Sequence, residues 1–211
     1  MRKIIIAGFL MTLTTATPLF AQTNASDITA LTERVARLEK QVQEMSRLIE
    51  PMKAQQAVEA RRLKLRENFN KKMKADSAKY TPEQLRQAEQ LYQVANQKWG
   101  SPEAAQSLQT MIQKYPDVNR TGCAVLYVAQ MSQGEERAKN LQACIEKYND
   151  CMYGDGVQVG AYARYLSSHD LKASGDLKKA QALADEIKAQ YPDAVDHSGN
   201  LLVDSLKAEF K

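Results

Sequence analysis

The sequence predicts an all-α protein made of long helices and helical repeats. Ala, Gln, Lys, Glu and Leu dominate the chain after its first residues, which is typical of helical proteins. Runs in which β-branched and polar residues alternate, the usual sign of strands, are missing. A similar pair of helical signals also returns several times after residue 80, which indicates a repeat architecture.

Residues 1–21 have the pattern of a secretory signal peptide. Two basic residues come first, an apolar stretch follows, and Leu19-Phe20-Ala21 precedes the polar Gln22. The apolar stretch is shorter than the roughly 20 residues that a membrane-spanning helix needs. Cleavage after Ala21 is therefore favoured over an uncleaved anchor, and we expect the mature protein in the periplasm or outside the cell.

The formal net charge argues against nucleic acid as a partner. The whole chain carries +4, and Arg2 and Lys3 of the signal peptide contribute two of these charges. The mature chain is therefore close to neutral, whereas nucleic-acid-binding domains are usually strongly basic.

Residues 26–52 follow the heptad pattern of a coiled coil. Apolar residues recur at alternating spacings of three and four, and the outer positions are polar. Arg34 lies five residues before Glu39, the offset at which parallel chains form ion pairs between copies. We expect a homo-oligomer, a dimer or a trimer, rather than a helix packed on its own domain. The core positions are Ile28, Leu31, Val35, Leu38, Val42, Met45, Ile49 and Met52.

A basic helical linker is expected at residues 53–79. Pro51 should kink or break the helix near Glu50, because proline pushes the preceding residue away from helical geometry. The basic side chains are spread around the helix, which favours a solvated connector. A surface that contacts anionic lipid or polymer is the alternative. The basic residues are Arg61, Arg62, Lys64, Arg66, Lys71, Lys72 and Lys74.

Residues 80–211 repeat a helical unit. The first helix opens with a capping box, in which Thr81 and Gln84 cap each other around Pro82. Small and apolar residues then recur three or four apart, as on the buried face of a helix. The final residues, 196–211, should form a terminal capping helix. Similar tetrapeptides close three helices, the first two of them 33 residues apart: 114–117 (Lys-Tyr-Pro-Asp), 147–150 (Lys-Tyr-Asn-Asp) and 190–193 (Gln-Tyr-Pro-Asp).

These paired helices, with a period near 34 and a proline after the second helix, resemble the tetratricopeptide repeat family. Gly175, Ala180 and Pro192 stand at that family's spacing, although its usual Trp-Leu-Gly-Tyr helix is not recognisable. The resemblance implies antiparallel helical hairpins whose first helices line a concave groove. The groove candidates are Arg120, Tyr127, Tyr162, Arg164 and Tyr165.

The order of signal peptide, coil, basic linker and repeats is similar to that of the Tol-Pal-associated cell division coordinators of Gram-negative envelopes. In that family the coil trimerises and the repeats bind envelope partners. The resemblance implies a protein-binding adaptor whose partner is an envelope protein or peptide.

The sequence offers no pattern for a catalytic, cofactor or metal site. The two histidines, His169 and His197, lack a metal-binding spacing such as HExxH, and His197 is expected in a loop. The glycine-rich segment 153–156 follows no strand, so a nucleotide site is disfavoured. We expect a binding protein and not an enzyme. The alternatives are a structural envelope spacer without a specific ligand and an enzyme with an unrecognised site.

Cys123 and Cys144 lie at equal distances from the turn expected at Gln133-Gly134, so antiparallel helices would place them at the same height. A disulfide there would close a loop of about 20 residues and add roughly 3 kcal/mol of stability. The alternative is that both are reduced and act as small apolar residues. Cys151 would then be the free thiol.

Overall fold

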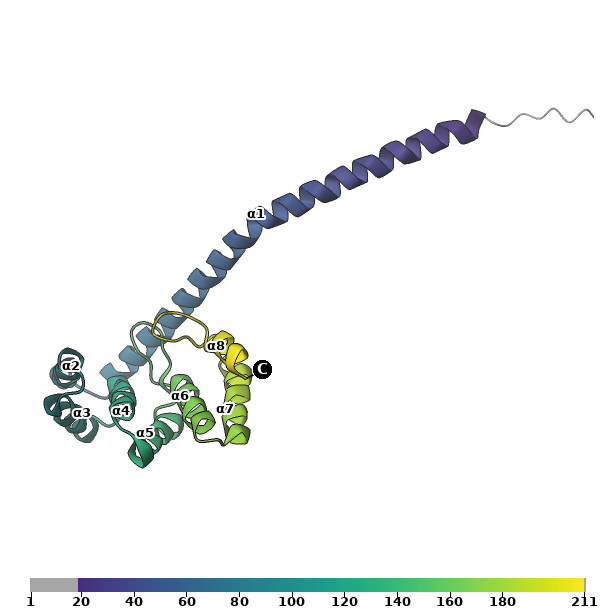
Figure 1. Ribbon diagram of the computed structural model, residues 1–211. Helices are drawn as coiled ribbons and strands as arrows, with labels where there is room; N and C mark the ends of the chain where they lie inside the picture. Colours follow the sequence, from purple (N-terminus) through teal and green to yellow (C-terminus); the bar gives the residue numbers. More distant parts are fainter. Residues whose placement is uncertain (1–18, 211) are drawn as a thin grey trace, which may run out of the picture. The chain divides into compact units, whose positions relative to one another are not determined.

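The structure is a computed structural model that describes residues 19–210, apart from the side chains of residues 19–26 and 54. Most of the predicted signal peptide, residues 1–18, lies outside the described residues. Within them the fold is all-α, as the sequence predicts, with isolated β-bridges at Met152–Gln158 and Val195–Leu201 but no strand (Figure 1). The helices are α1 (Leu19–Ser77), α2 (Pro82–Gln97), α3 (Pro102–Lys114), α4 (Asn119–Met131), α5 (Gly134–Glu146), α6 (Val159–Ala173), α7 (Leu177–Gln190) and α8 (Leu202–Glu209).

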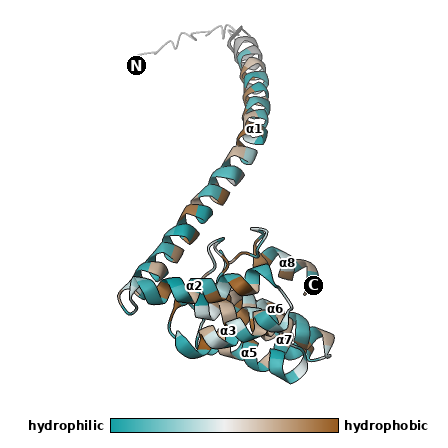
Figure 2. Cartoon of the chain, turned by 90° about the vertical axis from the view of Figure 1, so that its left-hand side faces the viewer, coloured by the Kyte–Doolittle hydropathy of each residue, from teal (hydrophilic) through white to brown (hydrophobic). Residues whose placement is uncertain are grey.

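The chain divides into two units, residues 1–56 and residues 57–211. The described part of the first unit is a single stretch of α1, and every described side chain on it is exposed. The apolar residues at the predicted heptad positions are 44–63% exposed. Figure 2 shows hydrophobic residues interleaved with hydrophilic ones along this helix. Within this unit no other described segment covers the apolar positions.

Pro51 lies inside α1, which continues on both sides of it. Of the kink or break that the sequence suggested near Glu50, the break is therefore absent. A proline removes one backbone donor and crowds the preceding turn. Both flanking segments are nevertheless helical, so the loss of one donor does not end the helix.

The C-terminal part of α1 belongs to the same compact unit as α2–α8, from Ala57 onward. The Lys64 ammonium lies 2.7 Å from the Asp193 carboxylate, and the Lys72 ammonium lies 3.5 Å from that of Asp150. The segment predicted as a free linker is thus attached to the helical body along part of its length.

Helices α2–α7 pack as three successive pairs, α2 with α3, α4 with α5, and α6 with α7, each joined by a short turn (Figure 1). The first helices of the pairs are also neighbours, because α2 contacts α4 and α4 contacts α6. Helix α8 packs on α7. This order places α2, α4 and α6 side by side as one layer.

Side-chain caps fix the starts of several of these helices. The Thr81 hydroxyl accepts the Gln84 N–H, and the Gln84 side chain accepts the Thr81 N–H, which completes the predicted capping box. At the start of α3 the Ser101 hydroxyl accepts the Ala104 N–H, and at the start of α7 the Asp176 carboxylate accepts the Lys179 N–H. The starts of these three helices therefore follow from local sequence.

Small residues let the helices of the body approach closely. Ala88, Ala104, Ala124 and Ala163 are fully buried where helices cross, and larger apolar side chains fill the space between the crossings. Gly160, at the start of α6, is pressed against Asn149, and an added Cβ there would collide with the Asn149 backbone. A second apolar cluster joins α6, α7 and α8.

Candidate binding surface

Aromatic side chains from different helix pairs meet on the layer formed by α2, α4 and α6. The Tyr127 ring on α4 stacks on the Tyr92 ring of α2, with 5.3 Å between centroids. It also meets the edge of Trp99 at 4.8 Å and the tilted ring of Tyr153 at 5.9 Å. Tyr127 is therefore the point at which the aromatic side chains of the first two pairs join.

The contacts continue onto the third helix pair through two loops. Tyr153 comes from the α5–α6 loop, and its ring lies 4.9 Å from the imidazole of His197 in the α7–α8 loop. His197 in turn lies 5.2 Å from the Tyr162 ring on α6. Tyr162 stacks on Tyr165 at 5.8 Å, and Tyr165 meets His169 at 4.5 Å.

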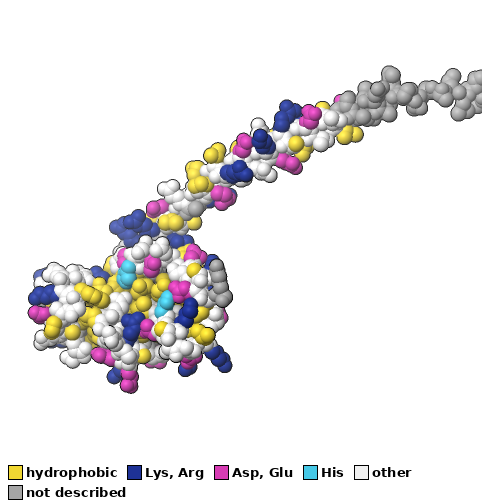
Figure 3. All heavy atoms as spheres, viewed as in Figure 1, with side chains coloured by type: hydrophobic (Ala, Val, Ile, Leu, Met, Phe, Trp, Pro, Cys, Tyr) yellow, Lys and Arg dark blue, Asp and Glu magenta, His cyan; other side chains and the backbone are white. Residues whose placement is uncertain are grey.

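We call this continuous set of rings the aromatic face. Exposure varies along it, since Trp99 at one end is 52% exposed, whereas Tyr153 in the middle is 5% exposed and forms part of the floor. Figure 3 shows both histidine side chains on one side of the body, beside surface hydrophobic side chains. The aromatic face consists of Trp99, Tyr127, Tyr153, His197, Tyr162, Tyr165 and His169.

Hydrogen bonds hold two of the tyrosine rings of this face in place. The Tyr127 hydroxyl bonds to Asn96 Oδ1 at 2.6 Å, and the Tyr153 hydroxyl donates to the Cys123 carbonyl at 3.1 Å. Burial raises the pKa of Tyr153 well above its usual value, so this hydroxyl stays protonated. Fixed rings lose little conformational entropy when a ligand binds, which favours affinity.

Each histidine has its Nδ1 atom on a carboxylate. His197 Nδ1 lies 2.8 Å from Asp155 Oδ2, and His169 Nδ1 lies 3.1 Å from Glu209 Oε2. Partial burial acts to raise the pKa of Asp155, but hydrogen bonds from His197 and from the Val157 N–H outweigh it and hold that pKa below its usual value. These pairs tie the loop and α8 to the edge of the aromatic face.

Three of the predicted groove residues, Tyr127, Tyr162 and Tyr165, lie on the aromatic face. Arg120 lies at its margin, where its guanidinium covers the Tyr92 ring at 4.7 Å and its Nε bonds to Glu89 at 2.8 Å. The charge of Arg120 is therefore already paired within the chain.

Arg164 does not line the aromatic face. It is 7% exposed, and its guanidinium bonds to Glu186 at 2.8 Å and to Asn149 at 2.7 Å. Tyr162 and Tyr165 are three residues apart and share one side of α6, whereas Arg164 is turned by about 200° from Tyr162, since each helical residue adds about 100°. It joins α6 to α7 instead.

Trp99, Tyr153, His169 and His197 were not predicted as site residues. Tyr153 and His197 lie in loops, where helical periodicity gives no signal. Trp99 lies in the turn just beyond α2, and His169 has no distinguishing pattern on its helix. Their spatial grouping depends on the packing of segments far apart in the chain.

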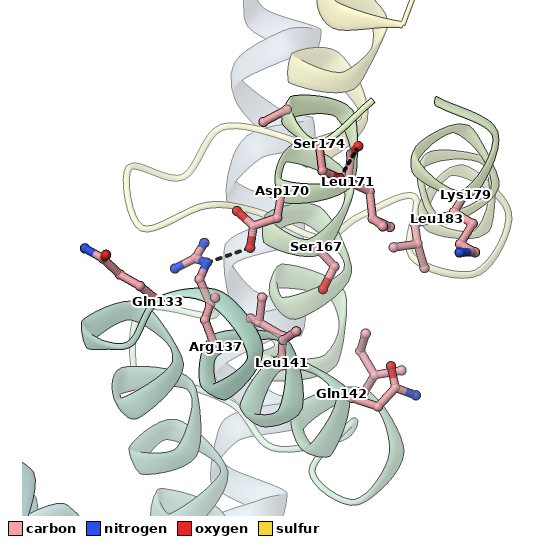
Figure 4. A pocket seen from close by; sticks show the side chains of 14 residues that line it. Gln133, Arg137, Leu141, Gln142, Ser167, Asp170, Leu171, Ser174, Lys179 and Leu183 are labelled. Atoms are coloured by element: carbon pink, nitrogen blue, oxygen red, sulfur yellow. Dashed lines mark hydrogen bonds and ion pairs between the residues drawn. The ribbon is translucent and has the colours of Figure 1, made fainter. Parts of the chain in front are cut away.

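Apart from the aromatic face, the body has a hollow of about 830 Å³ between α5, α6 and α7 (Figure 4). Apolar side chains such as Leu141, Leu171 and Leu183 line it. Arg137 also lines it, but its guanidinium bonds to Asp170 at 2.6 Å and to a backbone carbonyl. This hollow consequently presents mainly apolar surface with an internally paired charge.

The described histidines and cysteines lack several features that are common in catalytic and metal centres. No group of three or more His, Cys, Asp or Glu that could hold a metal occurs among them. In residues 27–210, neither imidazole has a hydroxyl or thiol hydrogen-bonded to it. Burial raises the pKa of Cys151 to about 11 and raises that of Cys123 further, so these thiols stay protonated and are poor nucleophiles.

All three cysteines are free in the structure, and Cys123 and Cys144 are completely buried. This arrangement corresponds to the interpretation in which they act as small apolar residues. A Cys123–Cys144 bridge in protein made in an oxidising compartment stays a prediction, which non-reducing peptide mapping decides.

In comparisons with known proteins, no family model matches the chain, and neither does any curated protein or solved structure. The resemblances to tetratricopeptide repeats and to the Tol-Pal-associated coordinators therefore stay predictions. Among the helices of the described part, none is both long and apolar enough to span a membrane.

Proposed function

We propose that the protein is an exported adaptor that binds an extended peptide segment of an envelope protein along its aromatic face. The observation that supports this most is the unbroken series of ring contacts from Trp99 to His169, which runs over three helix pairs. Tyrosine and tryptophan are enriched where proteins bind other proteins, because they offer a large apolar area together with a polar group.

The arrangement of the helices is consistent with a tetratricopeptide-like array. Three helix pairs follow one another, and their first helices form a common layer. In solenoids of this kind that layer is the ligand-binding side. The aromatic face occupies this layer together with two adjacent loops, so the sequence-based resemblance and the position of the face favour the same binding surface.

The adaptor is oligomeric in this proposal. The heptad positions from Ile28 to Met52 are exposed on the isolated helix, and a second or third copy would cover them. Several aromatic faces would then be linked through one coil. Linked sites bind a multivalent partner far more tightly than single sites do, since later contacts form at high effective concentration.

The two alternative functions, a structural envelope spacer and an enzyme, would require different features of the protein surface. A structural envelope spacer has no need for ordered rings on a half-exposed face. A hydrolase built on a carboxylate–histidine pair also needs a nucleophile beside the imidazole, and no hydroxyl or thiol of the described residues is hydrogen-bonded to His169 or His197. Both alternatives are therefore less well supported than peptide binding.

Affinity capture from an envelope extract tests the proposal when it compares matched surface variants. Trp99→Ala removes a 52% exposed ring from the aromatic face, and Leu177→Ala removes a 61% exposed side chain at the start of α7. The proposal predicts a defined partner that is retained by the wild type and by Leu177→Ala but lost with Trp99→Ala. Equal retention by both variants would contradict it.

A further inference from the structure

A hollow of about 500 Å³ lies between the C-terminal part of α1 and the loop of residues 154–156. Leu65 and Phe69 contribute apolar surface to it, and Arg62 and Arg66 contribute positive charge. The two arginines are four residues apart on α1 and therefore lie on the same side of the helix, one turn from each other.

The arginines of this hollow have no partner among the described residues. No ion pair or hydrogen bond involves Arg62 or Arg66, although the neighbouring Lys64 is paired with Asp193. The carboxylate that lines the hollow, Asp155, is already bonded to His197. Two guanidinium groups thus remain available for a ligand from outside the chain.

The loop that forms the opposite wall of the hollow contains two glycines, which have no side chain to fill the space. A Cβ at Gly154 would meet only the Phe69 ring, at 3.9 Å, so the space beside this residue is open. At Gly156 the backbone φ is +96°, and a Cβ would lie 3.0 Å from the Leu65 side chain. Gly156 therefore lets the loop approach α1, while Gly154 leaves room that a larger side chain would occupy.

The hollow adjoins the aromatic face at two points. Asp155 lines the hollow and holds His197, which contacts the tyrosines of the face. Phe69 lines the hollow as well, and its ring lies 6.0 Å from the guanidinium of Arg120, at the margin of the face. A chain lying along the aromatic face could therefore extend into the hollow without leaving the protein surface.

We infer that this hollow is a seat for the carboxylate of an Asp or Glu side chain in the peptide that the aromatic face binds. The inference rests on the proposed function and adds the chemistry of the partner, an aromatic- or proline-containing segment with an acidic residue at one end. Guanidinium groups bind carboxylates through paired, charge-assisted hydrogen bonds, and the apolar wall accommodates the methylene groups of the acidic side chain.

Selection of a random dodecapeptide phage library on the full-length mature protein tests this inference. Enriched peptides should carry Asp or Glu at a fixed distance from aromatic or proline residues. A synthetic peptide of the enriched sequence should lose about tenfold or more in affinity when its acidic residue is replaced by Gln or Asn. The double variant Arg62→Glu/Arg66→Glu should show the same loss of affinity. Gly154→Val should do so as well, because its side chain would fill the hollow.

The matched control is Lys71→Glu/Lys74→Glu, which makes the same change in net charge on the same helix, at exposed residues outside the hollow. It should leave affinity for the peptide within about twofold of the wild type. Thermal unfolding of each variant separates lost binding from lost folding.

Each other outcome has a distinct meaning. If peptides are enriched and their binding depends on Trp99 but they show no preference for acidic residues, the carboxylate site in the hollow is wrong. Peptide binding by the aromatic face is then still supported. If no peptide is enriched, both the seat and the proposed function are wrong. If phosphatidylglycerol vesicles bind in an Arg62- and Arg66-dependent manner while acidic peptides do not, the hollow serves a lipid headgroup and the peptide seat is overturned.

Discussion

The Asn119 backbone N–H donates to both carboxylate oxygens of Asp76, at 3.1 and 3.0 Å. Asn119 is the first residue of α4, and the preceding Val118 has no side chain that can cap the helix. The Asn119 side chain also forms two hydrogen bonds of 2.8 Å with the backbone of Met152. The end of α1, the start of α4 and the α5–α6 loop are therefore joined at one point.

Replacing Asp76 by Ala should destabilise the body by about 1–2 kcal/mol, since an N-terminal helix donor would lose its cap in a buried place. Urea unfolding of the variant measures this. Glu67→Ala, at an exposed position of the same helix, should change the unfolding free energy by less than about 0.5 kcal/mol. Equal effects of the two substitutions would show that the Asp76 contact contributes nothing.

Gly160→Ala should destabilise the protein by about 1–3 kcal/mol, even though alanine is the better helix former. The reason is the collision of the added Cβ with Asn149. Gly154→Ala is the matched control, because its Cβ would make only an ordinary contact with Phe69. Thermal unfolding followed by circular dichroism compares them, and a stabilised Gly160→Ala would contradict the packing described for the start of α6.

The Asp155–His197 pair should make a small, acid-sensitive contribution to stability. The pKa of Asp155 is lowered in the folded state, so its contribution is present above the usual aspartate pKa of about 3.9 and is lost as pH falls through the folded-state value. Because the pair is partly exposed, the effect should stay below about 1 kcal/mol. The unfolding free energies of wild type and Asp155→Asn should differ at pH 6 and converge toward pH 3. A difference that grows as the pH falls would contradict a lowered pKa of Asp155 in the folded state.

The oligomer should dissociate when charge is placed in the heptad core. Val35→Asp/Val42→Asp puts carboxylates where apolar side chains of different copies are expected to meet, and burying unpaired charge is costly. Ala36→Asp/Gln43→Asp adds the same residue type at outer positions and should leave the oligomer intact. Light scattering at micromolar concentration gives the mass, and a wild-type monomer would remove the basis for avidity.

The all-α fold and several helix starts could be predicted because they depend on local signals. Thr81 caps α2 together with Gln84, three residues away, and apolar spacing identifies the buried faces. The attachment of α1 to the body could not be predicted in the same way. It depends on contacts such as Lys64 with Asp193, whose partners are 129 residues apart in the sequence.

The candidate site was predicted only in part, for the same reason. Tyr127 and Tyr162 were found because the expected hairpins place first helices on the groove side. His197 and Tyr153 come from loops, and their positions depend on how the α5–α6 and α7–α8 connections fold over α6. Arg164 was wrongly assigned to the groove, because helical geometry turns it about 200° from Tyr162, toward Glu186 of α7.

Site-specific photo-crosslinking in the cell envelope tests the central claim, peptide binding on the aromatic face, most directly. Benzoylphenylalanine at position 99 should yield a discrete crosslinked adduct on irradiation, and the adduct should disappear when Tyr127→Ala and Tyr162→Ala are introduced as well. The same probe at position 177, where Leu177 is 61% exposed at the start of α7, should give none. No adduct at position 99, or adducts of equal yield at both positions, would contradict the claim.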